Sequence, residues 1–396
     1  MSTPSAPLSG AALPGAASAR PAATRDAASV VREFVSSTSP VTPRNGAGFM
    51  PCQGLYHRPS GHWPKVAFIA THYNVDFSEH YLGPYMAARG FGFLGWNTRY
   101  RGNEPFFLLD HALVEIGVGV RWLREKAGVE RVVLLGNSGG GSLMAAYQSQ
   151  AVAVDIRPAP GLPLPPALYD LLPGDLYISL NAHAGRPEVL TDWMDPSVTD
   201  ERDPFSVDPA LNPFDPANGP PYSAEFVTRY RAAQVARNNR ITDWCLNQLD
   251  DVKSRGASER VFTLARVWAD LRMIDPTLEP SRRLPRRCYA GDPRRANYAP
   301  MNVGMTNSLR TWLNMWSLRE GQCRGAPHLA KVRVPSLVIQ SLGDTGVFPS
   351  DAWRIYDLLG ATTRSLHLLD GDHYLTEPDG ARDHVADLIA GWVKAR

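Results

Sequence analysis

The fold of this chain is decided by residues 131–151, which read RVVLLGNSGGGSLMAAYQSQA. An apolar run of strand length leads directly into Gly136-Asn-Ser138-Gly-Gly140, and residues typical of a helix follow. The motif fits G-x-S-x-G, and strand, sharp turn and helix form the setting in which such a motif exposes its serine. Small residues on both sides let the chain reverse direction tightly. We therefore predict that Ser138 is a nucleophile at the carboxyl edge of a sheet.

The pattern around this stretch alternates between strands and helices. Predicted strands cover residues 30–37, 54–57, 65–71, 91–96, 131–135, 176–180, 335–340 and 365–369. Predicted helices cover residues 78–89, 109–127, 142–151, 350–359 and 381–394. Several of the strands are continuous apolar runs, which are typical of a sheet covered on both faces. The alternation predicts an α/β protein with a mostly parallel central sheet flanked by helices.

The pattern breaks between residues 181 and 330. This segment begins with a Pro- and Asp-rich stretch and continues with predicted helices at 223–253, 258–273 and 305–318. We interpret it as a mainly helical cap inserted into a core made of residues 30–180 and 331–396. Residues 1–29 are rich in Ala, Pro, Ser and Gly, which predicts a disordered tail.

The composition excludes several classes of protein. Lys and Arg number 41 against 39 Asp and Glu, so the net charge of +2 gives no reason to expect nucleic acid as a partner. No apolar run reaches the roughly 18–20 residues of a membrane helix. The N-terminus lacks the early basic residue of a secretory signal, so we expect a cytoplasmic protein. Four widely spaced cysteines favour separate thiols over a zinc site or disulfides: Cys52, Cys245, Cys288 and Cys323.

A serine hydroxyl needs a base to act as a nucleophile at neutral pH. Asp344 comes just after the predicted strand 335–340, and His373 lies in the loop after the next one. The 29 residues between them leave room for one helix and one strand, so both loops can open at the same sheet edge. Asp370 and Asp372 share the loop of His373 and are better interpreted as turn residues.

In these features the sequence resembles the α/β-hydrolase family. The resemblance covers residues 30–180 and 331–396 and rests on the Gly136–Gly140 turn and on the two loops that carry Asp344 and His373. It implies an α/β-hydrolase fold in which Asp344 orients His373. The imidazole would take the proton of Ser138 and later give it to the leaving group.

The resemblance also implies an oxyanion hole. One donor would be the backbone N–H of Gly139, directly after the nucleophile, at the positive end of the following helix. The second would come from the loop after strand 65–71, through Tyr73 or Asn74. Members of the family commonly have His-Gly where this chain has His72-Tyr73, and glycine adopts backbone angles that tyrosine resists. The alternative is that His72 and Tyr73 only pack beneath the cap.

The sequence says less about the substrate. Phe348 and Tyr374 neighbour the predicted acid and base, so together with His72 they are the candidates for lining a substrate pocket. The tryptophans of the cap are better interpreted as its own core. A basic cluster between Arg282 and Arg295 either recruits an anionic substrate or is a solvated loop, and its Pro, Gly and Asp neighbours favour the loop.

The function implied is hydrolysis of a carboxylic ester of a small, apolar or aromatic substrate through an acyl-enzyme. Amidase, thioesterase and C–C bond hydrolase activities use the same three groups. An acyltransferase and a non-catalytic ligand-binding protein are further alternatives. The mechanism needs no cofactor and no metal, and no Walker, dinucleotide or H-E-x-x-H motif occurs. The sequence leaves open whether the chain forms a homo-oligomer.

Overall fold

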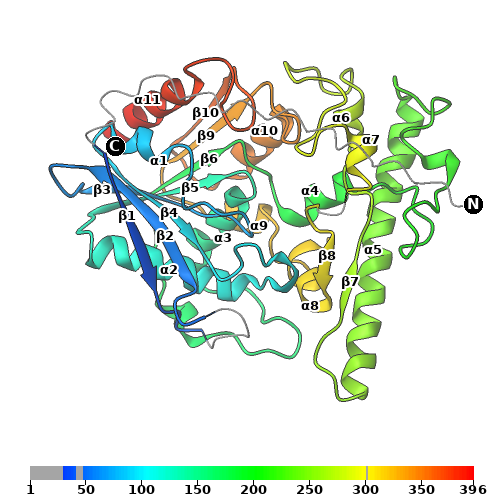
Figure 1. The fold of residues 1–396 in the computed structure, drawn as a ribbon, viewed down its shortest axis with the longest axis horizontal. Coiled ribbons are helices and arrows are strands. Elements are labelled where there is room, and N and C mark those ends of the chain that lie inside the picture. The colour runs from blue at the N-terminus through cyan, green and yellow to red at the C-terminus, as the bar shows by residue number, and fades with distance from the viewer. Residues whose placement is uncertain (1–29, 42–47, 300–301) are drawn as a thin grey trace, which may run out of the picture.

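A computed structural model describes residues 30–41, 48–299 and 302–396, so the predicted tail 1–29 lies outside the described residues. Within these ranges, eight strands form one sheet in the order β1-β2-β4-β3-β5-β6-β9-β10 (Figure 1). In the described sheet, the pairs β1–β2 and β2–β4 are antiparallel and the remaining pairs are parallel. The strands are β1 (Val30–Ser37), β2 (Cys52–Pro59), β3 (Val66–Ala70), β4 (Gly92–Asn97), β5 (Arg131–Asn137), β6 (Leu176–Leu180), β9 (Ser336–Ser341) and β10 (Arg364–Leu369).

Helices cover both faces of this sheet, as the continuous apolar runs predict. On β5, Val132 and Leu134 pack into one hydrophobic core, and Val133 and Leu135 pack into a second core on the other face. The first face is covered by α2 (Leu109–Glu125), α3 (Gly140–Val152) and α10 (Pro349–Leu358), and the second by α1 (Gly83–Ala87) and α11 (Ala381–Lys394). The prediction of a mostly parallel sheet flanked by helices is confirmed.

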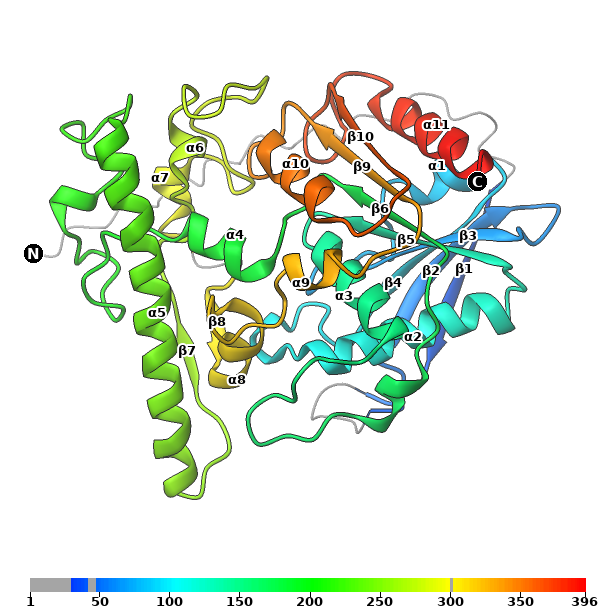
Figure 2. The same cartoon turned by 180° about the vertical axis from the view of Figure 1, so that it is seen from behind.

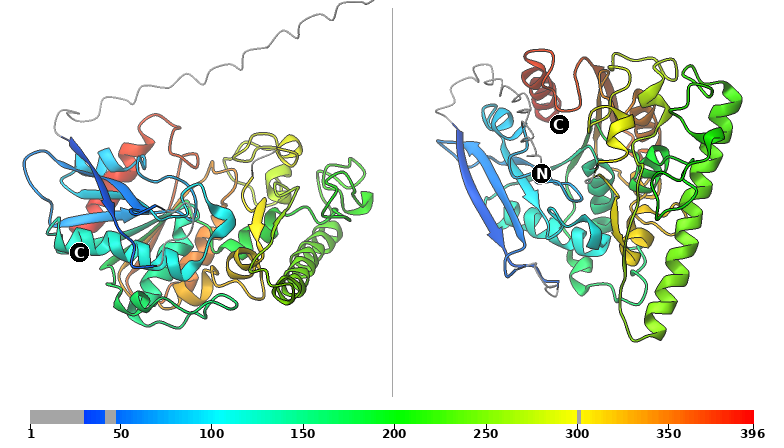
Figure 3. Two further views of the ribbon diagram at one scale, coloured as in Figure 1. Left: turned by 60° about the horizontal axis from the view of Figure 1, so that its bottom comes forward. Right: turned by 45° about the vertical axis from the view of Figure 1, so that its right-hand side comes forward.

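Residues 181–330, here called the insertion, run between β6 and β9. Its helices are α4 (Arg186–Trp193), α5 (Ala224–Ser254), α6 (Leu271–Ile274), α7 (Pro293–Ala296), α8 (Leu309–Thr311) and α9 (Ala326–Leu329), and its strands are β7 (Val261–Thr263) and β8 (Thr306–Ser308). Short helices of other types occur before the insertion at Glu104–Phe106 and Pro166–Asp170, and within it at Pro209–Leu211 and Trp312–Trp316. The long helix α5 stands on the side of the insertion that faces away from the sheet (Figures 2 and 3).

One predicted helix of the insertion is wrong, and another is shorter than predicted. Residues 258–273 contain β7 and the short α6, because Val261–Thr263 pair antiparallel with Thr306–Ser308. The helix predicted at 305–318 is shorter than predicted, because Thr306–Ser308 belong to β8. It begins at Leu309 and continues as a π-helix to Trp316. In the core, the helix predicted at 78–89 is shortened to α1. The N–H of Phe77 is donated to the side chain of Asn97, and the helix begins only at Gly83, with Pro84 in its first turn.

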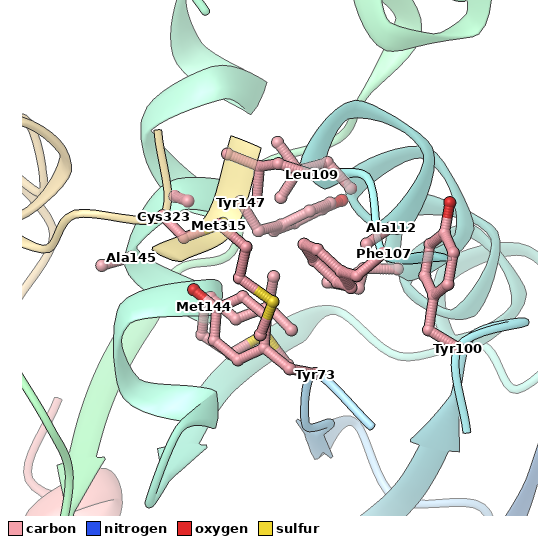
Figure 4. Close-up of a cluster of buried hydrophobic side chains, with 14 of the residues drawn as sticks. Tyr73, Tyr100, Phe107, Leu109, Ala112, Met144, Ala145, Tyr147, Met315 and Cys323 are labelled. Atoms are coloured by element: carbon pink, nitrogen blue, oxygen red, sulfur yellow. The ribbon is translucent and has the colours of Figure 1, made fainter. Parts of the chain in front are cut away.

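The insertion and the sheet share one hydrophobic core. Met315 and Cys323 of the insertion lie among Tyr73, Phe107 and Met144 of the sheet part (Figure 4). This packing fixes the insertion over the carboxyl ends of the central strands. In the part of the chain that the structure describes, no helix combines the length and the apolar character needed to cross a membrane.

Candidate active site

The predicted nucleophile sits in a tight turn between β5 and α3. Ser138 has a positive φ of 55°, which L-residues rarely adopt outside a constrained turn. Its N–H donates to the carbonyl of Leu180 at 3.1 Å, which ties the turn to the end of β6. A side chain at Gly140 would place its Cβ 2.3 Å from the carbonyl oxygen of Thr71. The glycine at this position is therefore required by the close approach of the β3 end, and Ser138 is left half-buried at the sheet edge.

The structure brings Asp344 and His373 together. Their loops follow β9 and β10, and Nδ1 of His373 lies 2.6 Å from Oδ2 of Asp344. The other carboxylate oxygen accepts the N–H groups of Gly346 and Val347 at 2.9 and 3.0 Å. Both side chains are buried, with 1% of Asp344 and 6% of His373 exposed. The bond at Nδ1 fixes the imidazole so that Nε2 remains for a reacting group.

A tyrosine of the insertion contacts both members of this pair, and no sequence signal marks it. The hydroxyl of Tyr289 donates to Oδ1 of Asp344 at 2.8 Å and lies 2.9 Å from Nδ1 of His373. Burial, and then the charge of Asp344, raise the pKa of this phenol well above its usual value, so it remains a donor. Tyr289 belongs to no motif, and only the tertiary fold places it here.

Ser138 contacts a different histidine from the predicted one. Its Oγ lies 3.5 Å from Nε2 of His183, and among the described residues no hydrogen bond joins it to His373. His183 is buried, and no carboxylate of the described chain hydrogen-bonds to it. Burial, and then the charge of Arg186, lower its pKa well below the usual value. The available sequence signal was its place three residues after strand 176–180, at the same sheet edge as Ser138.

The predicted oxyanion donors lie around the amino end of α3. In the described part of the chain, the N–H groups of Gly139 and Tyr73 have no hydrogen-bond partner. The N–H of Asn74 instead points to Nδ1 of His72 at 3.4 Å. The ring of Tyr73 is buried beneath the turn, and its hydroxyl lies 3.1 Å from Oγ of Ser142. Of the two residues considered for the second donor, Tyr73 is therefore the one with a free N–H.

The three predicted pocket residues have different surroundings. A cavity of about 650 Å³ opens beside His373 and is lined by Tyr289, Tyr374 and Arg282, among others. Tyr374 is half exposed, and its ring lies 4.9 Å from that of His373. His72 is buried, and its Nε2 lies 2.7 Å from the point where a Cβ at Gly139 would stand.

Phe348 is fully buried between the guanidinium groups of Arg272 and Arg283, 4.2 and 5.1 Å from its ring centre. It does not line the cavity beside His373. Arg282 of the basic cluster does line that cavity, and it forms an ion pair with Asp370. Across the described ranges, no group of three or more His, Cys, Asp or Glu side chains is arranged to hold a metal ion.

Comparisons with known proteins gave structural likeness only. No family model and no curated protein sequence matches the chain. Among solved structures, an α/β hydrolase from Penicillium sp. is 11% identical, with a TM-score of 0.49 over 92% of this chain and 97% of that one. A soluble variant of the monoglyceride lipase of Saccharomyces cerevisiae is 13% identical, with a TM-score of 0.46 over 92% and 95%. The esterase domain of a Rhodothermus marinus protein is 10% identical, with a TM-score of 0.45 over 92% and 98%.

The fold follows from the chain's own geometry. A mostly parallel sheet is covered on both faces, and its central strand β5 ends in a serine turn from which α3 departs. The first βα loop and the loops after β6, β9 and β10 carry histidines and an aspartate to the edge where that serine stands. A strained strand-to-helix turn that exposes a serine at the sheet edge is the nucleophile elbow of the α/β hydrolases. The chain has the α/β-hydrolase fold.

Proposed function

We propose that this protein is a serine hydrolase that cleaves a carboxylic ester through an acyl-enzyme. The observation that carries the proposal is the 2.6 Å bond between His373 and Asp344, at the sheet edge where the elbow holds Ser138. An imidazole oriented by a buried carboxylate, at the same sheet edge as a strained serine, provides the base and the nucleophile that such a reaction needs. The Gly139 and Tyr73 N–H groups are free to bind an oxyanion.

The reaction proceeds in two halves. Ser138 attacks the ester carbonyl while His373 takes its proton, and the oxyanion of the tetrahedral intermediate accepts from the N–H groups of Gly139 and Tyr73. The intermediate collapses as His373 gives the proton to the departing alcohol, which leaves Ser138 acylated. Water then attacks the acyl group with His373 as base, and the acid is released.

His373 is the base in this scheme although Ser138 contacts His183. Protonation of His373 creates a cation that Asp344 stabilises at 2.6 Å. Protonation of His183 has no such partner and is opposed by burial and by Arg186, which lower its pKa. In the proposal, the hydrogen bond between Ser138 and His373 forms when substrate binds, because catalytic hydrogen bonds are often long or poorly aligned until then.

The cavity beside His373 fits the alcohol part of the substrate. Its wall includes the rings of Tyr289 and Tyr374, which suit a small apolar or aromatic group. The insertion supplies Tyr289, and we propose that it acts as a cap over the site. Amides, thioesters and activated C–C bonds are cleaved by the same three groups, so they belong in the substrate panel.

A fluorophosphonate probe and a panel of esters test the proposal. We expect the wild type to be labelled at Ser138 and to hydrolyse esters, while Ser138→Ala is neither labelled nor active. Intact mass and peptide mapping locate the label. A folded wild type that is not labelled and hydrolyses no ester, amide or thioester would contradict the proposal and favour a ligand-binding protein.

A further inference from the structure

Arg186 is a buried arginine beside the nucleophile turn that the scheme above does not use. It begins α4, directly after Gly185, and only 1% of it is exposed. A Cβ placed on Gly139 would lie 3.0 Å from both Cζ and Nη1 of its guanidinium group. A permanent cation therefore stands next to the residue that follows the nucleophile.

The guanidinium of Arg186 forms an ion pair with Glu104, but two of its nitrogens lack hydrogen-bond acceptors among the described residues. Its Nε and Nη2 atoms are buried and have no hydrogen-bond acceptor in the described part of the chain. The facing carboxylate, Glu104, stays 3.7 Å away, and its Oε1 is also without a hydrogen bond in the described ranges. A buried charged donor without a hydrogen-bond acceptor lowers the stability of the folded protein. Such donors in native proteins therefore indicate a site where a ligand or water binds.

Other buried arginines of this protein donate hydrogen bonds to well-placed acceptors, and Arg186 differs from them in this respect. Arg237 is fully buried and donates to Glu201 at 2.8 Å and to the carbonyl of Asp195 at 2.8 Å. Arg266 is 3% exposed and donates to Asp195 at 2.8 Å. The fold can therefore supply acceptors for buried guanidinium groups, and it does not do so at the active site.

The side chains around Arg186 favour an anionic ligand over a neutral one. The guanidinium carbon lies 4.5 Å from the ring centre of Tyr73 and 5.1 Å from that of Trp316, so two aromatic faces hold its plane. Burial lowers the pKa values of the neighbouring His72 and His183 well below the usual value, and these rings stay neutral. The planar fork of a guanidinium matches both oxygens of a carboxylate.

We infer that Arg186 binds a carboxylate on the acyl part of the substrate, so that the substrates are monoesters of short dicarboxylic acids. The inference rests on the proposed function and narrows it. The acyl side is chosen because Arg186 lies beside Gly139, whose N–H is the proposed donor to the acyl oxyanion. The cavity beside His373 is lined by Tyr289 and Tyr374 and not by Arg186, and His373 is the group that protonates the alcohol. The acid is short because the guanidinium directly adjoins the nucleophile turn.

The test compares two substrates that differ in one group. Monoethyl succinate carries a carboxylate where ethyl succinamate carries an uncharged amide of nearly the same shape. A pH-stat measures the acid released when the ethyl ester of either substrate is hydrolysed. We expect the wild type to prefer monoethyl succinate by about 100-fold in kcat/KM. Arg186→Met should abolish that preference, because it slows the charged substrate about 100-fold more than the neutral one.

Further variants keep the test decisive if Arg186→Met unfolds. The double variant Arg186→Met with Glu104→Gln removes both charges, so no carboxylate remains buried without a partner, and it should lose the same preference. Arg282→Met changes an exposed arginine of the cavity at His373. Loss of the preference in Arg282→Met, with Arg186→Met retaining it, would overturn the inference. Equal rates on both esters in the wild type, or equal losses on both in Arg186→Met, would overturn it as well.

A binding measurement separates this inference from the proposed function. Titration calorimetry with succinate is carried out on Ser138→Ala, which cannot turn over any substrate. Binding that is lost in Ser138→Ala with Arg186→Met supports the carboxylate site even if no ester is hydrolysed. Absence of succinate, malonate and glutarate binding to Ser138→Ala, in a wild type that hydrolyses neutral esters, would refute the site and leave the hydrolase proposal standing.

Discussion

The two sides of Ser138 differ in how completely their polar groups are paired. On one side, His373 and Asp344 bond to each other, and Tyr289 donates to the carboxylate. On the other side, Nε and Nη2 of Arg186 have no acceptor in the described residues. The polar groups of the first side are paired with one another, whereas we infer that a ligand supplies the acceptors on the second.

This difference shows where the protein gives up stability for function. An unpaired buried donor costs about 1–3 kcal/mol, and more when it is charged. The N–H groups of Gly139 and Tyr73 are also unpaired on this side within the described chain. Groups prepared in this way need no rearrangement when negative charge develops in the reaction. The predictions below test each side separately.

The largest effect on activity is expected when the two histidines near Ser138 are substituted one at a time. His373→Ala should lower kcat/KM by about 10⁴-fold or more, because the serine loses its base. His183→Asn should lower it by less than about tenfold, since the Asp344 and His373 pair remains. Steady-state kinetics on one ester measures both variants. A greater loss in His183→Asn than in His373→Ala would assign the base to the histidine that Ser138 contacts.

Asp344→Asn should reduce kcat by about a thousandfold. An amide in place of the carboxylate no longer stabilises the imidazolium and favours the wrong tautomer of His373. KM should change little, because the carboxylate does not touch the substrate. Rates within tenfold of the wild type would show that the paired side of the site is structural.

Tyr289→Phe should reduce kcat by about tenfold, the equivalent of one lost hydrogen bond to a charged acceptor. KM should stay within about twofold, whereas damage to the cavity would raise KM. Tyr169→Phe removes a hydroxyl from an exposed tyrosine and serves as the matched control. An unchanged kcat in Tyr289→Phe would mean that this hydroxyl has no positioning role.

The smallest effect concerns the pH dependence of stability. His72 and His183 have pKa values well below 6.5 in the folded protein, so the unfolded chain binds more protons below that pH. The wild type should therefore lose stability as the pH falls from about 6.5. His183→Asn should weaken that dependence, and His62→Asn, at an exposed position, should leave it unchanged. Urea unfolding between pH 5 and 8 measures the slopes.

A steeper slope in His183→Asn would contradict the burial argument. Part of the slope should remain in every variant. Burial also lowers the pKa of His57 to about 4 and that of His80 to about 3, which adds the same sign of pH dependence.

The sheet and the nucleophile turn were predictable because their signals are local. Strands 30–37 and 176–180 and helix 381–394 have the predicted bounds, and each is a continuous pattern between turn residues. The loops of Asp344 and His373 were located from strand ends alone, because parallel strands bring their carboxyl ends to one edge.

The unpredicted residues depend on contacts between distant segments. Tyr289 reaches Asp344 across 55 residues, and Arg186 faces Glu104 from the start of a different helix. No periodicity or motif marks such pairs. The false helix at 258–273 has the same cause, since pairing with Thr306–Ser308 overrides the local preference of Val261–Thr263. His183 is the exception, because it follows a correctly predicted strand.

The bond from Tyr289 to Asp344 links the insertion to the proposed active site. The donor belongs to the insertion and the acceptor to the sheet. An insertion that swung away as a rigid lid would take this hydroxyl with it and leave the carboxylate with a different environment. In the proposed mechanism, only molecules in which the insertion rests on the sheet would keep both hydrogen bonds of the Asp344 carboxylate to Tyr289 and His373.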